Sequence, residues 1–450
     1  MPRFIDLFME VLRAKKTSMR EKLGMKEDSI INEALKAVFD RNWHQIPRED
    51  LEEVHVFAVD GSRAMREYVG GARFYVTRAF GVTNKGEKAR LLDSDVFYAR
   101  GREEEVQGYI SLKTEFVEMK LALQNVKKLK GDLKFILIDG SLYGRMSHLF
   151  REFPVDGDSA FSLDYIKLYS ELLEKCKENN IHLVGVSKDS RANFTKTLLL
   201  KELFSEELKA LKETLTPEER LTLSRCFKTI NTNPNFTFEK LTELKKRHGR
   251  ALEKMEAILL EARIGTDFQM ISHFASSPGY TTPVELGAQE QAMTMLKNIS
   301  RNAEGYVRHN FKNAIVENYN RRDEFLREAV ETIRLILNFP TVVSFHVLFD
   351  PRDTPIRVDV PSWDVGLDNT MRELTGNLLL YEFKEKVEEV LRLLLSGYGG
   401  LRNYNVWLKY ADDMVKLHLR DVDDIYERAL ERELGFLLIH TRGYRRVQYP

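Results

Sequence analysis

The stretch KFILID, residues Lys134–Asp139, is a short apolar run that ends in an aspartate followed by Gly-Ser. An earlier stretch, HVFAVD at His55–Asp60, leads into the same Asp-Gly-Ser sequence. A third run, HLVGVS at His182–Ser187, is followed by Lys-Asp-Ser. Apolar runs of this length that end at turn-forming residues are typical of buried strands, so we predict three core strands, each followed by a turn.

The elements between these runs predict the topology. Strands are expected at Ala72–Thr83 and Arg90–Tyr98, which with the first core strand would form an antiparallel meander. Helices are expected at Tyr109–Leu129 and Asp164–Glu178, each before a core strand, so that the core strands run parallel. This order is that of an RNase H-like fold. We therefore predict the α/β class, with a mixed sheet flanked by helices.

We predict four segments along the chain. Residues 1–50 form an N-terminal helical segment, and residues 51–191 form the first part of the RNase H-like core. Residues 192–335 form a large, mainly helical insertion or cap. Residues 336–450 complete the core with strands and helices. Within the last two segments, single helices are expected at 238–262, 374–395, 404–418 and 422–434, and strands at 341–349 and 355–360.

Composition limits the class of protein. Hydrophobic residues make up 43% and charged residues 31% of the 450 residues, as in soluble globular proteins. The apolar runs are too short to span a bilayer, and the N-terminal stretch lacks the apolar block of a signal peptide, so we expect no membrane contact and a cytoplasmic location. Two cysteines, Cys176 and Cys226, provide neither a disulfide framework nor a Cys-based zinc site. Lys+Arg and Asp+Glu both number 69, so positive charge for DNA binding must be gathered locally.

Asp60 and Asp139 each follow an apolar strand and should lie at one edge of the sheet, where open α/β sheets keep their sites. Two adjacent carboxylates repel each other unless a cation lies between them. Two-metal phosphodiester cleavage uses that arrangement, with divalent ions about 4 Å apart. An ordinary turn explains one Asp-Gly after a strand. Two Asp-Gly-Ser motifs in this topology favour a metal site.

A third carboxylate is expected from the helix before Lys134. With the apolar residues of that helix taken as its buried face, Glu115 lies about 60° from the centre of the face and Glu118 about 120°, at roughly 100° per residue. Glu115 can therefore reach the rim of the sheet, whereas Glu118 is expected to face solvent. The alternative for Glu115 is an ordinary charged residue on the flank of the helix.

A fourth ligand is expected from the C-terminal helix at 404–418. Asp412 borders the apolar face of this helix, and Asp413 points away from it. His418 lies on the apolar stripe itself, where a core or capping histidine is the commoner outcome. We rank Asp412 first, His418 second and Asp413 third.

Two cations could contact phosphate. Lys188 follows the third core strand and could hold the scissile phosphate or stabilise transition-state charge. Arg63, three residues after Asp60, could bind a flanking phosphate. The alternative for each is a surface cation. The HExxH, Walker A and GxGxxG motifs and the GxSxG elbow are absent from the sequence.

The sequence resembles the NurA nucleases of archaea and some bacteria. The resemblance is carried first by FAVDGSR (Phe57–Arg63), ILIDGSLYG (Ile136–Gly144) and VGVSKDS (Val184–Ser190). Further matches follow in the family's order: GTDFQMI (Gly265–Ile271), IRVDVP (Ile356–Pro361) and LGFLLIHTRGYRR (Leu434–Arg446). The resemblance therefore covers nearly the whole chain.

The resemblance implies a Mn²⁺-dependent nuclease with single-strand endonuclease and 5′-to-3′ exonuclease activity. It also implies a homodimer with a central DNA channel, docked on the hexameric ATPase HerA and acting in DNA-end resection and double-strand-break repair. By position, Asp60 and Asp139 match the family's strand-end metal ligands, Glu115 corresponds to its acidic helix residue, and the C-terminal ligand falls near Asp412. An oxygen-rich carboxylate site suits Mn²⁺ or Mg²⁺ and not zinc.

Two other classes of protein compete with a nuclease. An actin-like phosphotransferase or ATPase shares the core topology but would need a second core with Gly-rich phosphate turns, and Ser396–Gly400 (SGYGG) has no strand before it. A catalytically inactive DNA- or protein-binding subunit would keep only the fold. The pair Asp60 and Asp139 argues against that subunit, because a scaffold gains nothing from two adjacent carboxylates.

Overall fold

The computed structural model describes residues 3–23, 29–47, 51, 53–146 and 149–441. The chain divides into two compact units. The first comprises residues 1–46, 189–284 and 345–356, and the second comprises residues 47–188, 285–344 and 357–450. Residues 24–28 and 48–50 of the expected N-terminal segment, and 442–446 of the LGFLLIHTRGYRR stretch, lie outside the described residues.

The second unit contains the predicted core sheet. Strands β2 (Val54–Glu67), β3 (Arg73–Thr83) and β4 (Lys88–Phe97) form the antiparallel meander. The further strands are β5 (Leu133–Asp139), which is parallel to β2, β6 (Ile181–Ser187), which is parallel to β5, and β10 (Ile356–Pro361), which is antiparallel to β6. The order β10-β6-β5-β2-β3-β4 confirms the mixed sheet of an RNase H-like fold.

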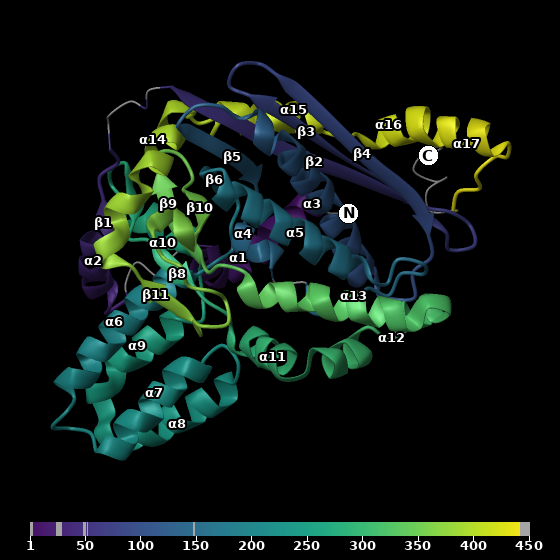
Figure 1. Cartoon of the computed structure of the whole chain (residues 1–450). Helices are drawn as coiled ribbons and strands as arrows, with labels where there is room; N and C mark the ends of the chain where they lie inside the picture. The colour runs from purple at the N-terminus through teal and green to yellow at the C-terminus, as the bar shows by residue number, and fades with distance from the viewer. Residues whose placement is uncertain (1–2, 24–28, 48–50, 52, 147–148, 442–450) are drawn as a thin grey trace. The chain divides into compact units, whose positions relative to one another are not determined.

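Helices cover both faces of this sheet (Figure 1). Helices α3 (Glu103–Asn125) and α5 (Phe161–Glu178) contribute to the main core cluster together with inward side chains of the sheet such as Val59. Helix α15 (Val406–Val415) packs on the opposite face, against Phe80 and its neighbours on β3. Because both faces are covered, β5 and β6 bury most of their side chains, which explains their continuous apolar sequences.

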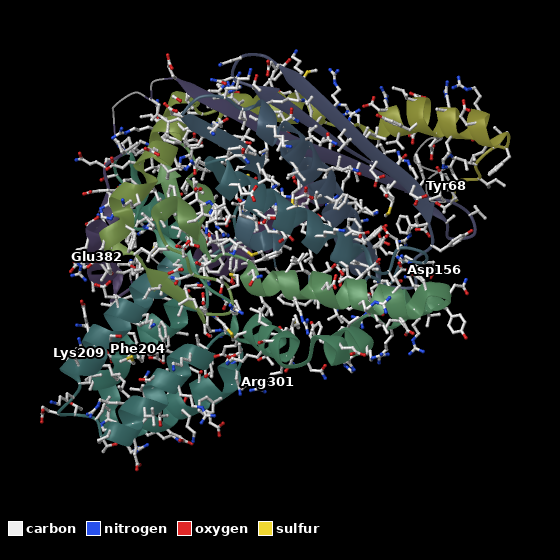
Figure 2. The ribbon with its side chains drawn as sticks, viewed as in Figure 1. Tyr68, Asp156, Phe204, Lys209, Arg301 and Glu382 are labelled. Carbon is white, nitrogen blue, oxygen red and sulfur yellow. The ribbon has the colours of Figure 1, made fainter. Side chains whose placement is uncertain are left out.

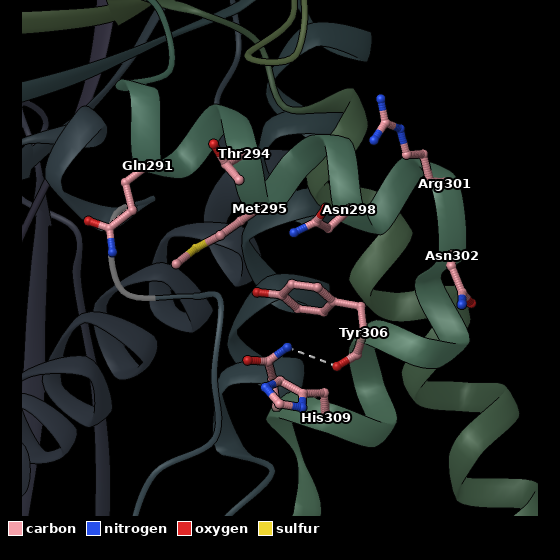
Figure 3. A pocket seen from close by; sticks show the side chains of 9 residues that line it. Gln291, Thr294, Met295, Asn298, Arg301, Asn302, Tyr306 and His309 are labelled. Atoms are coloured by element: carbon pink, nitrogen blue, oxygen red, sulfur yellow. Dashed lines mark hydrogen bonds between the residues drawn. The ribbon is translucent and has the colours of Figure 1, made fainter.

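The remainder of the second unit is largely helical. Its helices are α4 (Leu142–Arg145), α11 (Glu290–Asn310), α12 (Lys312–Glu317), α13 (Arg322–Leu335), α14 (Glu388–Ser396), α16 (Leu419–Asp421), a π-helical turn at Val422–Glu427, and α17 (Arg428–Leu434). Helix α11 bends at Asn302, whose side chain accepts a hydrogen bond from the Gly305 amide at 2.8 Å and caps the second half of the helix. Figure 3 shows the cavity of about 620 Å³ beside this bend, lined by Arg301 and Tyr306 among others.

The C-terminal helices are hydrogen-bonded and ion-paired to residues at the C-terminal end of β2. The Tyr68 hydroxyl, labelled in Figure 2, donates to Glu427 Oε1 at 2.7 Å, and Arg66 pairs with Asp423 Oδ1 at 2.7 Å. Arg78 on β3 donates to the Val415 carbonyl at 2.7 Å. The segment after α15 is therefore held by side chains that project from the meander.

The helix expected at 374–395 is wrong in its first half. Strand β11 (Asn377–Leu379) and a 3₁₀ turn at Tyr381–Val387 precede α14. Gly376 donates its amide to the Ala288 carbonyl at 3.0 Å and accepts from the Gly287 amide at 2.9 Å. These long-range backbone bonds satisfy groups that a helix would have used, so α14 begins only at Glu388.

The first unit is mainly helical. Its helices are α1 (Phe4–Leu23), α2 (Asn32–Arg41), α6 (Phe194–Ala210), α7 (Pro217–Thr229), α8 (Pro234–His248), α9 (Glu253–Glu261) and α10 (Asp267–Phe274). The single helix expected at 238–262 is therefore wrong. It is two helices, because Gly249 adopts φ +54°, a conformation that glycine adopts without the steric cost other residues meet.

Short strands join the helices of the first unit. β1 (Trp43–His44) pairs antiparallel with β7 (Gly279–Thr281). Three strands have residues in both units: β8 (Val284–Leu286), β9 (Val342–Leu348) and β10. Cys176 and Cys226 are buried free thiols. Among the helices that the structure describes, none has the length and apolar character needed to cross a bilayer.

We predict that Gly81→Ala destabilises the sheet. A Cβ at Gly81 would lie 2.1 Å from the ring of Phe57, which is buried and cannot move away. The expected loss in free energy of unfolding is about 1–3 kcal/mol, as for other overpacked cores. Urea unfolding followed by circular dichroism measures it.

Gly108→Ala is the matched control. Gly108 lies within α3 and a Cβ there meets no atom within 4 Å. This helical glycine should gain about 0.5–1 kcal/mol on substitution by alanine. Equal stability of the two variants would contradict the packing described for β3.

Candidate active site

The sheet brings Asp60 and Asp139 together. Their strands β2 and β5 pair in parallel, and the register sets Val59 beside Ile138, so the two aspartates are the next residues along neighbouring strands. Asp60 is buried, and its Oδ1 accepts a hydrogen bond from the Gly61 amide at 2.7 Å. The carboxylates that the sequence predicts at one edge of the sheet are thus neighbours.

The two Asp-Gly-Ser motifs have different backbone structures. After Asp60 the strand continues, because Gly61 pairs with Ala79 of the long strand β3. The turn predicted there is wrong. After Asp139, Gly140 has φ +110° and the chain makes the predicted turn, which leads into the short helix α4.

Glu118 of α3 joins the two aspartates. It is 5% exposed, so the expectation that it faces solvent is wrong. The reason is that α3 is covered on its flanks by both the sheet and α5, which buries a broader face than its apolar stripe indicates. A Cβ at Gly61 would lie 2.3 Å from Glu118 Oε1, so this glycine makes room for the carboxylate against β2. Glu115 is half-buried and accepts a hydrogen bond from the Tyr165 hydroxyl at 2.6 Å.

Arg145 connects the acidic residues from the inside. Its Nη2 donates to Glu118 Oε2 at 2.5 Å and to the Asp139 carbonyl at 3.4 Å, and its Nη1 lies 3.9 Å from Glu115 Oε2. Burial disfavours the charge of Arg145, but Glu118 and Glu115 outweigh it and raise its pKa. The guanidinium therefore stays charged and holds the Glu118 carboxylate in place.

Two residues bind the Asp139 carboxylate: Lys188, which follows β6, and Tyr404, in the loop before α15. Lys188 Nζ lies 2.8 Å from Asp139 Oδ2, and the Tyr404 hydroxyl donates to the same oxygen at 3.1 Å. The ammonium of Lys188 also lies 4.9 Å from the centre of the Tyr404 ring. Burial lowers the pKa of Lys188, but Asp139 outweighs it and the net shift is upward.

Of the three candidates for the C-terminal ligand, Asp412 is the one whose charge acts on Lys188 and Tyr404 of the cluster. It is half-buried, lies 3.6 Å from Lys409 Nζ, and contributes to the raised pKa of Lys188. Asp413 is exposed and pairs with Lys409. His418 is exposed and lies beyond the end of α15.

A cavity of about 340 Å³ opens onto this cluster. It is lined by Gly61, Arg63, Ser111, Thr114, Glu115, Glu118, Asp139, Gly140, Ser141, Gly144 and Arg145. Arg63 is exposed at this cavity, and its Nη1 donates to Ser111 Oγ at 2.5 Å. Acidic side chains from a helix and a strand thus share one hollow with two arginines.

Sequence reasoning did not single out Glu118, Arg145 and Tyr404 for this site. For Glu118 a signal existed, because it lies one helical turn after Glu115 and the two side chains share a flank of α3. Arg145 gives no signal, because a buried arginine is recognised only by its partners. Tyr404 precedes α15 in a loop, and the loop position brings its hydroxyl to Asp139.

Residues 54–417, more than half of the chain, match the NurA domain family. The chain belongs to the NurA family. No curated protein matches it in sequence. The match covers every residue of the cluster around Asp60 and Asp139.

Solved structures of NurA proteins align with nearly the whole chain. The crystal structure of the NurA nuclease from Sulfolobus solfataricus is 15% identical, with a TM-score of 0.51, covering 97% of this chain and 98% of that one. A crystal structure of NurA bound to dAMP and manganese is 15% identical, with a TM-score of 0.43, covering 95% and 96%. The likeness to the Sulfolobus protein shows a shared fold.

The electrostatics of this NurA-family site favour a cation. Burial, together with Asp139 and Glu118, raises the pKa of Asp60 to about 8. Burial raises the pKa of Glu118 to about 7, although Arg145 opposes it. Among the residues that the structure describes, no three His, Cys, Asp or Glu side chains are close enough to hold a metal ion as they stand. The donors are all carboxylate oxygens, and a cavity opens beside Glu115, Glu118 and Asp139, so the residues fit Mn²⁺ or Mg²⁺.

We predict that Asp60→Asn stabilises the metal-free protein. At pH 7.5 the Asp60 carboxylate is ionised in the unfolded chain, whereas the fold disfavours that charge because the pKa is raised to about 8. Removing the charge should raise the free energy of unfolding by about 1–3 kcal/mol. Thermal melts in the presence of a chelator measure the change.

Asp132→Asn serves as the control for this change. Asp132 is an exposed aspartate before β5, and its substitution should change stability by less than about 0.5 kcal/mol. A lower melting temperature for Asp60→Asn than for wild type would contradict an unfavourable negative charge at Asp60 in the folded protein.

Proposed function

We propose that this chain is a divalent-metal-dependent deoxyribonuclease. The observation that carries the proposal is the cluster of the buried Asp60 and Glu118 with the half-buried Asp139, in which carboxylates from two strands and one helix repel one another beside an open cavity. Such a cluster is unfavourable for a scaffold and suited to divalent ions. Membership of the NurA family supports the assignment to a nuclease.

We assign Asp60, Asp139 and Glu118 as the central metal ligands, and we retain Glu115 and Asp412 as further ligands. Glu115 lines the same cavity, and the negative charge of Asp412 contributes to the raised pKa of Lys188. The expected metal is Mn²⁺, with Mg²⁺ as the alternative. When bound, a divalent ion would supply activation of water and stabilisation of the leaving oxygen.

The cations of the site have separate roles in this proposal. Lys188 is 38% exposed beside Asp139, so its ammonium can bind the scissile phosphate and stabilise charge in the transition state. Arg63 is exposed at the cavity and binds a flanking phosphate. Arg145 is too deeply buried for that task, and its role is to orient Glu118.

The finer activity rests on the family resemblance. We propose single-stranded and end-containing DNA as substrates, with single-strand endonuclease and 5′-to-3′ exonuclease activity. We also propose action with a hexameric HerA-type ATPase in DNA-end resection and double-strand-break repair, in the cytoplasm. The four segments 1–50, 51–191, 192–335 and 336–450 remain our proposal for domain organisation, with the nuclease core in the second and fourth.

We predict that wild-type protein cleaves end-labelled single-stranded DNA with Mn²⁺ or Mg²⁺ and not with a chelator. Asp60→Asn and Asp139→Asn should each lower the rate at least about 100-fold, because each removes a charged ligand. Asp132→Asn should cleave like wild type. The assay is run with and without a HerA-type ATPase.

Folding of every variant is checked by circular dichroism. Absence of wild-type cleavage with either metal, even with the ATPase added, would favour an inactive binding subunit. Cleavage that survives both ligand substitutions would show that the active site lies elsewhere.

Self-association is the second proposal that can be tested directly. Helix α1 exposes an apolar stripe that includes Phe4 at 92% and Phe8 at 54% exposure, and an isolated helix of this length is marginal in water. We predict that wild type is a homodimer and that Phe8→Asp, which places a charge on this stripe, shifts it to the mass of one chain. Light scattering after size exclusion measures the mass.

Thr17→Asp places the same charge on the polar side of α1 and should leave the dimer intact. If Phe8→Asp remains dimeric, the stripe on α1 is not the dimer contact. If wild type is monomeric, the homodimer itself is wrong.

A further inference from the structure

Hydrogen bonds to the buried Asp359 anchor the turn that follows Asp139. Ser141 Oγ donates to Asp359 Oδ2 at 2.6 Å and accepts a hydrogen bond from the Gly144 amide at 2.9 Å. The Tyr143 amide also donates to Asp359 Oδ2, at 3.3 Å. Asp359 is 0% exposed, so its carboxylate meets neither solvent nor substrate. Its contacts with this turn are therefore internal supports.

Arg357 fixes the Asp359 carboxylate. Arg357 Nε donates to Oδ1 and Nη2 donates to Oδ2, both at 2.9 Å, which is a bidentate ion pair. Arg357 Nε also donates to Ser344 Oγ at 2.9 Å. Both charges are buried, and a buried ion pair is weak support for stability alone. The ion pair with Arg357 instead fixes the orientation of Asp359, whose Oδ2 accepts the hydrogen bond from Ser141.

The turn also rests directly on the neighbouring strand β6. The Gly140 amide donates to the Val186 carbonyl at 2.8 Å, and a Cβ at Gly185 would lie 2.7 Å from the Gly140 carbonyl oxygen. Asp359 pairs with Gly185 in the antiparallel ladder between β10 and β6. The turn is thus held by a backbone bond to β6 and by the side chain of Asp359 on β10, the strand next to β6.

The other Asp-Gly-Ser motif has no such anchor. Ser62 Oγ accepts a hydrogen bond from the Leu417 amide at 2.9 Å and so helps to hold the segment after α15. The backbone after Asp60 stays in the sheet, because Gly61 and Ser62 pair with β3. The same tripeptide therefore continues a strand in one case and, in the other, ends a strand in a turn that a buried ion pair anchors.

We propose that Asp359, oriented by Arg357, is a positioning residue that acts through Ser141 to fix Asp139 and Arg145 in the active site. The inference rests on the proposed nuclease function. Asp139 and Arg145 are the first and last residues of the segment that Ser141 anchors, so loss of the anchor displaces a metal ligand and the arginine that orients Glu118. Arg63, the proposed ligand of a flanking phosphate, lies outside this segment, because its Nη1 donates to Ser111 Oγ of α3.

The test compares Ser141→Ala with Ser344→Ala. Each variant removes one hydroxyl from the same network, but Ser141 belongs to the turn, whereas Ser344 accepts a hydrogen bond from Arg357 Nε. For each, Mn²⁺ binding is measured by titration calorimetry without DNA, and kcat and KM are measured on single-stranded DNA. Ser141→Thr, which keeps the hydroxyl, is the rescue variant.

For Ser141→Ala we expect about a tenfold weaker Kd for Mn²⁺ and about a tenfold lower kcat, as for other residues that orient metal ligands. KM for DNA should be unchanged. Ser344→Ala should match wild type in all three quantities, and Ser141→Thr should restore most of the loss. Equal effects of the two alanine variants, or a change in KM alone, would overturn the inference. Wild-type protein that neither binds Mn²⁺ nor cleaves DNA would overturn the proposed function and this inference with it.

Discussion

Repulsion among buried carboxylates is the constraint around which the active region is arranged. Asp60, Glu118 and Asp139 come from three elements, and the surroundings of the buried Asp60 and Glu118 disfavour negative charge. Two cations compensate: Arg145 holds Glu118 from the interior, and Lys188 holds Asp139 from the more exposed side. A domain selected only for stability would replace such a cluster with apolar residues. The surrounding helices and turns keep the charges close in spite of their repulsion.

Small residues allow this crowding. Gly61 lets the Glu118 carboxylate approach β2, and Gly185 lets the turn at Gly140 rest on β6. A side chain at either glycine would separate the acidic residues or lift the turn from the sheet. Helix α3 then closes the arrangement, because it is pressed between the sheet and α5 and presents two glutamates to the same cavity.

Much of the fold was predictable because its signals are local. The apolar runs before Asp60 and Asp139 identify their strands, and the helices between them impose parallel pairing. The predictions of secondary structure are wrong where contacts between residues far apart in the sequence determine the structure. The ladder with β3 carries β2 straight through Gly61, and backbone bonds to Gly376 replace the first half of a predicted helix. Periodicity predicts a solvent-facing Glu118, because it describes one helix and not the element that covers the flank of that helix.

The candidate site was predictable to the same extent. A carboxylate at the end of an apolar run is visible in sequence, so Asp60 and Asp139 could be named, and the structure makes them neighbours. Arg145 and Tyr404 could not be named, because their role exists only in the distances to their partners. The continuation of β2 past Asp60 has a mechanical consequence. On the side of Asp60 the strand continues through the site, whereas Asp139 ends β5 and is followed by a turn, which one backbone bond to Val186 and the side-chain bonds of Ser141 hold. When the two acids must move apart or together, as for ions of different radius, the displacement falls on the turn.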